Sequence, residues 1–195
     1  MAGNTMGINY QQIKCPWPVD DNSQFDYLWA STESRHFGFP TTKLSTAFLS
    51  WADSKNIHVS FAEVFYLPAG CTVRRIHTDL DHITETCSKI NFILGGEDAP
   101  MQWFDLKENA KSHYDVNTAP TVVNTKQVSP YLSWPREECE VIEEAILSDA
   151  NIIHAGIPHV VFTKEKPRIA ISVVLQCKVS RQRLSVEQAL LRIQD

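Results

Sequence analysis

Two histidines and an aspartate are spaced so that they could bind one metal ion. His77 and Asp79 form a His-x-Asp pair at the end of an alternating segment. On a strand, residues i and i+2 share a face about 6.6 Å apart along the backbone, so both could reach one cation while Thr78 points away. His159 opens a later alternating segment after a Gly-Ile-Pro turn, 80 residues beyond Asp79. Two histidines and one carboxylate are the facial triad of non-haem iron, which leaves coordination positions open.

Another histidine competes for the third ligand position. His154 lies five residues before His159. We favour His159, because the turn starts its strand and because Arg168 follows nine residues later. The other four histidines have no partner pattern and are expected to be solvated: His36, His58, His82 and His113.

Arg168 opens a strictly alternating segment that could place a positive charge inside the protein. One face is a packing surface, formed by Ile169, Ile171, Val173 and Leu175. Arg168 and Ser172 are therefore expected on the other, inner face. A buried arginine needs an anion. No acidic residue lies in this segment, which favours a ligand anion; an ion pair with Glu143 or Glu144 is the alternative.

Residues 88–94 alternate in the same way. Their apolar residues at even positions pack outward, so Asn91 shares the other face with Lys89 and is expected as a buried amide facing a cavity. Trp103, in the next segment, is expected to line the same cavity.

Short segments with period-2 alternation, separated by turns, must position these side chains. They cover residues 58–67, 71–79, 88–94, 101–107, 121–128, 141–147, 151–155, 159–164 and 168–179. Helices are expected at 41–55, capped by Thr41 or Thr42, and at 185–194, where Ser185 and Gln188 form a capping box. No helix-length segments alternate with the strands, which disfavours a doubly wound α/β fold, and the pattern suggests an antiparallel sandwich, barrel or jelly roll.

Length and composition indicate one soluble globular domain. The chain has 195 residues, 43% hydrophobic and 21% charged, with a net charge of −5. We expect a single catalytic domain over 1–195, with an N-terminal arm and helix (1–57, irregular up to residue 40), a β core (58–179) and a C-terminal helix (180–195). The mild acidity argues against a nucleic-acid partner.

Five widely spaced cysteines without a Cys-x-x-Cys pair argue against disulfides and a zinc-thiolate site. No apolar run reaches about 18 residues, so no membrane span is expected. The N-terminus lacks the pattern of a secretory signal. The expected location is the cytoplasm.

The order of His77-x-Asp79, His159 and Arg168 resembles the Fe(II)- and 2-oxoglutarate-dependent oxygenases, over about residues 60–177. The resemblance implies a mainly β fold, the double-stranded β-helix or cupin-like jelly roll, with flanking helices. It also implies that His77, Asp79 and His159 bind Fe(II).

The same resemblance implies a site for 2-oxoglutarate as cosubstrate. Arg168 would hold its far carboxylate in a bidentate fork, with Ser172 and Tyr66 as weaker contacts, and Asn91 would lie at the metal-proximal end. Many members have Ser or Thr two residues after the arginine, where this chain has Ala170. The implied activity is a dioxygenase that uses O2 to oxidise a small-molecule or peptidyl substrate while 2-oxoglutarate is decarboxylated.

Two alternatives remain open. A cupin-type isomerase or dioxygenase that uses no 2-oxoglutarate would share Gly70, His77 and Glu85, but usually has a second histidine in place of Asp79 and needs no Arg168. A metal-free barrel that serves as a binding module would bind no metal.

Overall fold

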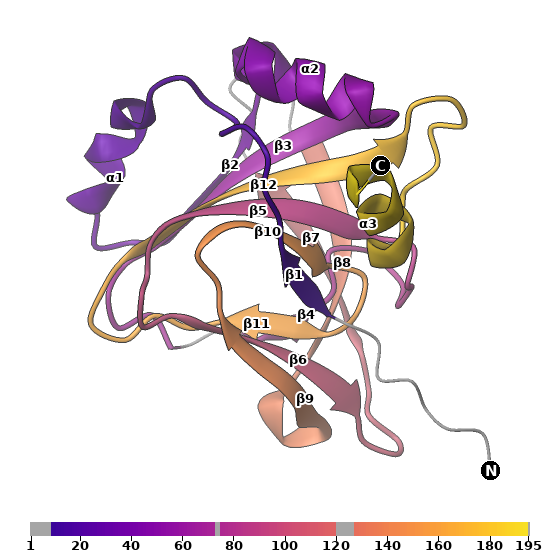
Figure 1. The fold of residues 1–195 in the computed structure, drawn as a ribbon. Helices are drawn as coiled ribbons and strands as arrows, with labels where there is room; N and C mark the ends of the chain where they lie inside the picture. The colour runs from indigo at the N-terminus through magenta and orange to yellow at the C-terminus, as the bar shows by residue number, and fades with distance from the viewer. Residues whose placement is uncertain (1–8, 73–74, 120–126, 195) are drawn as a thin grey trace.

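Two antiparallel β-sheets make up most of the protein in the computed structural model, which describes residues 9–72, 75–119 and 127–194 (Figure 1). The first sheet has the order β1 (Tyr10–Gln12), β10 (Asp149–His154), β5 (Ser88–Gly95), β12 (Arg168–Cys177), β3 (Ile57–Leu67) and β2 (Arg35–Phe39). The second sheet has the order β7 (His113–Ala119), β8 (Gln127–Trp134), β4 (Ile76–His77), β11 (His159–Val161), β6 (Pro100–Leu106) and β9 (Cys139–Ile146).

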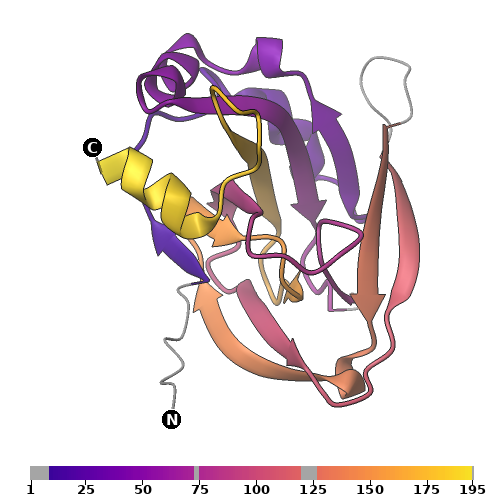
Figure 2. The ribbon, with the colours of Figure 1, turned by 90° about the vertical axis from the view of Figure 1, so that its right-hand side faces the viewer.

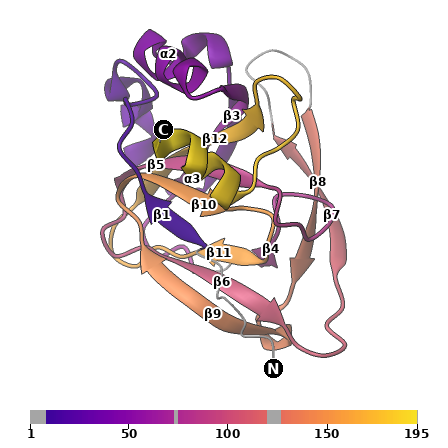
Figure 3. The same ribbon diagram turned by 45° about the vertical axis from the view of Figure 1, so that its right-hand side comes forward.

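The α-helices lie on the outer side of the first sheet, and the second sheet lies against its inner face (Figures 2 and 3). The α-helices are α1 (Asp26–Trp29), α2 (Thr46–Ser54) and α3 (Val186–Gln194), and the 3-10 helices are η1 (Asn22–Phe25), η2 (Thr41–Lys43) and η3 (Arg136–Glu138). The chain is therefore mainly β with two packed sheets.

Alternation along the strands of the first sheet divides apolar from polar residues. In β12, Ile169, Ile171 and Val173 belong to the large core beneath the helices. That core also holds Phe48 of α2, whose ring meets Phe92 of β5 edge-on at a centroid distance of 5.3 Å. The expected outward packing of both strands is confirmed, so their other residues face the second sheet.

The C-terminal helix begins as its sequence predicts. The Ser185 Oγ accepts the Gln188 backbone N–H at 3.1 Å, and the Gln188 Oε1 accepts the Ser185 N–H at 3.1 Å. At α2 the expected cap is wrong, because Thr41 forms part of η2 and Ser45 caps the helix instead, accepting from the Phe48 N–H at 3.1 Å.

Several expected elements differ from those observed. The stretch before residue 40 is not irregular throughout, because β1, α1 and β2 lie in it. The β7–β8 hairpin was not expected at its observed position, and the expected strand 121–128 lies outside the described residues except for its last two, which begin β8. The expected segment 71–79 contributes only β4 to the sheet.

All five cysteines are free thiols. Among the described residues, no helix combines the length and the apolar character that crossing a bilayer requires.

Gly96, directly after β5, allows the chain to pass close to the start of β12. Gly96 has φ +67°, and a Cβ added there would lie 2.7 Å from the Arg168 Cβ. Gly70 has a similar φ of +73° but has nothing within 4 Å of such a Cβ. The absence of a side chain at Gly96 therefore leaves room for the first carbons of Arg168.

We predict that Gly96→Ala destabilises the fold more than Gly70→Ala does. Both substitutions place an alanine in the left-handed backbone region, which costs about 1–2 kcal/mol. Only Gly96→Ala also crowds the side chain of Arg168, and such overpacking costs about 1–3 kcal/mol more. Urea unfolding at neutral pH measures both costs, and equal costs would contradict the prediction.

Candidate metal centre

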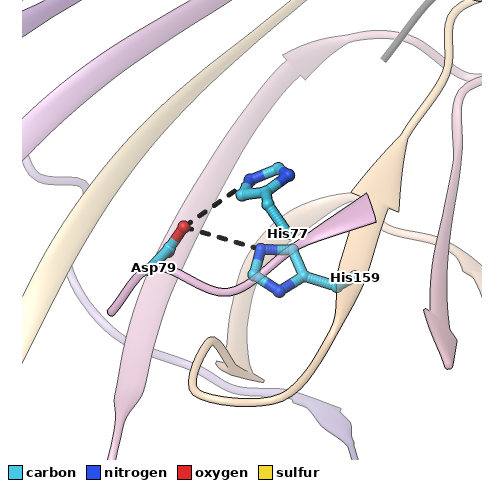
Figure 4. A group of neighbouring side chains, drawn as sticks. All are labelled: His77, Asp79 and His159. Atoms are coloured by element: carbon cyan, nitrogen blue, oxygen red, sulfur yellow. Dashed lines mark ion pairs between the residues drawn. The ribbon is translucent and has the colours of Figure 1, made fainter. Parts of the chain in front are cut away.

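The two histidines of the expected triad lie directly opposite each other on paired strands. β4 and β11 are antiparallel, and His77 is the register partner of His159. Side chains at directly opposite positions share a face, with Cβ atoms about 4.5–5.5 Å apart. The ring centroids are 4.8 Å apart and the rings are tilted by 48° (Figure 4). Strand pairing therefore joins two residues that are far apart in sequence.

Backbone contacts just after β4 return Asp79 to the same face. The Thr78 N–H donates to the Leu132 carbonyl at 3.0 Å, and the buried Thr78 Oγ1 donates to the Leu80 carbonyl at 2.6 Å. The Asp79 N–H donates to the Ala155 carbonyl at 3.0 Å. The Asp79 carboxylate consequently points toward both imidazoles (Figure 4).

The donor atoms of the triad are separated by distances that one ion could bridge. Asp79 Oδ1 lies 3.7 Å from Nε2 of His77 and 3.7 Å from Nε2 of His159. These separations are too long for hydrogen bonds. Two atoms each about 2.1 Å from one ion can be at most about 4.2 Å apart. Both carboxylate–imidazole distances fall within this limit. One ligand atom from each of the three residues lies within 4.8 Å of the others, a grouping that could hold a metal ion.

Both rings turn the same nitrogen toward the backbone. The Nδ1 of His159 lies 2.8 Å from the Ile157 carbonyl, and the Nδ1 of His77 lies 3.1 Å from the Arg75 carbonyl. A carbonyl only accepts, so each neutral ring carries its proton on Nδ1 and its lone pair on Nε2. Metal-bound histidines are commonly oriented by such a second hydrogen bond.

Lys89 of β5 lies between the triad and a second carboxylate. Its Nζ is 2.7 Å from Asp79 Oδ2 and 3.0 Å from Glu63 Oε2. Glu63 Oε1 in turn lies 2.8 Å from Nε2 of His36, whose ring stacks on Phe65 at 4.2 Å. A chain of polar contacts therefore runs from the edge strand β2 to the His77–Asp79–His159 triad.

These contacts keep the buried carboxylates ionised. Burial alone would raise the pKa of Asp79, but Lys89, His159 and His77 outweigh it and lower this pKa. Burial also opposes the ionised form of Glu63, whose pKa is nevertheless lowered by Lys89 and His36. For Lys89, desolvation is outweighed by Asp79 and Glu63, so its pKa is raised. Asp79 is therefore anionic, as a metal ligand must be.

Three of the four expected cosubstrate residues lie on the inner face of the first sheet. Arg168, Ser172 and Asn91 are all buried. Ser172 pairs with Glu63 on one side and with Asn91 on the other, so these side chains form a polar row across three strands. Within the described part of the chain, the buried Asn91 Oδ1 has no hydrogen-bond partner.

Tyr66 is not brought to this site. It lies in the outer core, where its hydroxyl donates to the Ser31 carbonyl at 2.8 Å and its ring meets Trp29 edge-on. Because alternation turns Tyr66 to the helix-covered face, the expected contact with a cosubstrate is wrong.

The other two candidates from the sequence have structural contacts near the centre. His154 directs Nε2 to the Glu85 carbonyl at 3.1 Å, so it does not join the triad. Trp103 is the register partner of His159 on β6 and is fully buried, donating its indole N–H to the His154 carbonyl at 3.1 Å.

Sequence reasoning missed Lys89, Glu63 and His36 as parts of the site. His36 was expected to be solvated, but its side chain is 16% exposed and contacts Glu63. The signal for Lys89 was its place on the inner face of an otherwise apolar strand, where a charge requires partners.

No family model matches this chain, and no curated protein matches it either.

We predict that Glu63 makes the stability of the protein depend on acid pH. Its folded pKa lies below the ordinary value of 4.5, so its contribution is fully present above that value and is lost as the pH falls through the folded pKa. Glu63→Gln is expected to lower the free energy of unfolding by about 1–3 kcal/mol at neutral pH. It should also reduce the loss of stability on acidification, which Asp79 would continue to cause in part.

Urea unfolding across this pH range, with a chelator present, measures the effect. Glu108→Gln, at an exposed turn residue, serves as the control and should behave like the wild type. A Glu63→Gln variant with the wild-type pH dependence would contradict the prediction.

Proposed function

We propose that the protein is an Fe(II)- and 2-oxoglutarate-dependent oxygenase. One observation carries the proposal: His77, His159 and Asp79 each offer one ligand atom within 4.8 Å of the others, and Asp79 Oδ1 lies 3.7 Å from Nε2 of both histidines, whose Nδ1 atoms face backbone carbonyls. Two histidines and one carboxylate are the ligand set of non-haem iron oxygenases.

The residues fit a divalent ion better than they fit a simple ion-pair cluster. The carboxylate–imidazole distances are too long for direct hydrogen bonds, and each Nδ1 already has a carbonyl partner. Bound Fe(II) would supply the redox chemistry with O2 that amino-acid side chains lack. The contribution of the chain is to hold the ion on one side and leave the other side open.

The order of the strands supports the jelly-roll form of this fold. Leaving aside the β7–β8 hairpin, the core strands from β3 to β6 alternate between the first and the second sheet, and those from β9 to β12 do the same. Such crossing between two facing sheets is expected of an eight-stranded double-sheet jelly roll, the architecture shared by cupins.

Arg168 is the residue that we assign to the far carboxylate of 2-oxoglutarate. It is buried on the inner face at the start of β12, and a guanidinium can bind a carboxylate through two parallel hydrogen bonds. Ser172 and Asn91 lie on the same face between Arg168 and Lys89, so both could contact a ligand that extends from Arg168 toward the metal. Arg168 is the feature that separates the proposal from a cupin that uses no 2-oxoglutarate, since such a protein needs no arginine at this position.

The substrate that we propose is a small molecule or a peptidyl side chain. The inner face would orient the cosubstrate and exclude bulk water, since its polar residues are buried.

We predict that the protein binds one equivalent of Fe(II), or of Mn(II) as a redox-stable substitute, and is thermally stabilised by it. His159→Ala should weaken metal binding by at least about a hundredfold, because it removes one of three ligands. The matched control is His82→Ala, since His82 also pairs with an aspartate, Asp81, at 2.8 Å but is exposed and outside the triad.

Titration under anaerobic conditions, followed by calorimetry and thermal unfolding, measures this binding. Equal affinities for the wild type and His159→Ala would rule out the triad as the metal site. A protein that is not stabilised by either ion would instead favour a metal-free binding module.

We predict that Fe(II) and 2-oxoglutarate added together under anaerobic conditions produce a visible metal-to-ligand charge-transfer band. Arg168→Ala should weaken 2-oxoglutarate binding by at least about tenfold, because the carboxylate loses a charge-assisted partner. Metal affinity should change much less. Arg35→Ala, which removes an exposed arginine paired with Glu33, is the control. Wild-type 2-oxoglutarate affinity in Arg168→Ala would contradict the role of this residue.

A further inference from the structure

The two oxygens of the Asp79 carboxylate have different surroundings. Oδ1 lies 3.7 Å from each of the two histidine Nε2 atoms. Oδ2 lies 2.7 Å from the Lys89 Nζ, a short charge-assisted contact. One oxygen therefore faces the metal position while the other is held by an ammonium group.

Lys89 is itself fixed by its surroundings. Its side chain is 5% exposed, and its Nζ makes a second ion pair with Glu63 at 3.0 Å and lies 5.9 Å from the centre of the Phe65 ring. If Lys89 moved away from Asp79, its buried positive charge would lose one of its two carboxylate partners, which is costly in a desolvated site. The Lys89 ammonium group is therefore held in place beside Asp79.

A carboxylate can bind a metal ion through one oxygen or through both. With two histidines, one-oxygen binding fills three of six octahedral positions, and two-oxygen binding fills four. Three open positions accommodate a chelating ligand together with one further ligand, whereas two do not.

Resting on the metal site of the proposed function, we propose that Lys89 is a positioning residue that restricts Asp79 to metal binding through Oδ1 alone. The contact with Oδ2 keeps that oxygen away from the ion, and the contact with Glu63 keeps this second carboxylate from becoming a further ligand. Lys89 thereby preserves the third open coordination position.

The test counts the water molecules on bound Mn(II), with the metal alone as the probe. Water-proton relaxation and electron paramagnetic resonance give the number of exchangeable waters per bound ion. The wild type should hold three, and Lys89→Met should hold at least one fewer, because Oδ2 becomes free to coordinate. Its Mn(II) affinity should rise by about tenfold, since a nearby positive charge is lost. Lys89→Arg, which keeps the charge, should restore the wild-type count.

Two further variants make the result decisive. Lys178→Met removes an exposed lysine paired with Asp53 at 2.6 Å and should change neither water count nor affinity. The double variant Lys89→Met with Glu63→Gln removes the carboxylate that would otherwise be left buried and unpaired, and it is used if Lys89→Met does not fold. It should show the same loss of water.

The failures of the two proposals are distinguishable. Wild-type protein that binds no Mn(II) overturns the metal centre and the role of Lys89 with it. Wild-type protein that binds Mn(II), with an unchanged water count in both Lys89→Met variants, overturns the role of Lys89 alone and leaves it a structural ion pair.

Discussion

A buried ammonium group ties the two sheets together at the candidate metal centre. Lys89 and Glu63 come from strands of the first sheet, whereas Asp79 follows β4 of the second. Removing one partner of a buried ion pair destabilises the fold, because the other charge is left with less compensation. The charge balance among these three residues therefore constrains how the sheets face each other and how the Asp79 carboxylate is oriented toward the two histidines.

The first sheet uses its two faces differently. Its outer face is apolar and packs beneath the helices, in the core that holds Ile169, Ile171 and Phe92. Its inner face carries buried polar and charged residues that an ordinary core would exclude, including Ser172 and Asn91. Because successive residues of a strand point to opposite faces, the same strands can supply both surfaces without interruption.

Much of this division could be predicted from local sequence, and the errors have identifiable causes. Strict alternation in β12 placed Arg168 on the inner face, and the capping box placed the start of α3. The β7–β8 hairpin was not predicted, because the sequence of His113–Ala119 is polar and lacks a clear apolar period. Tyr66 was misplaced because the alternation of its strand does not say which of its two faces is the inner one.

The sequence by itself determined which side chains share a strand face and that a His-x-Asp pair, a distant histidine and an arginine were available for one site. These features depend on backbone periodicity, which is local. Only the tertiary structure decided that His77 is the register partner of His159, that Lys89 reaches Asp79 and Glu63, and that His36 extends this chain of contacts. The physical reason is that strand register and sheet packing bring together residues far apart in sequence, and no local pattern specifies which buried charge meets which partner.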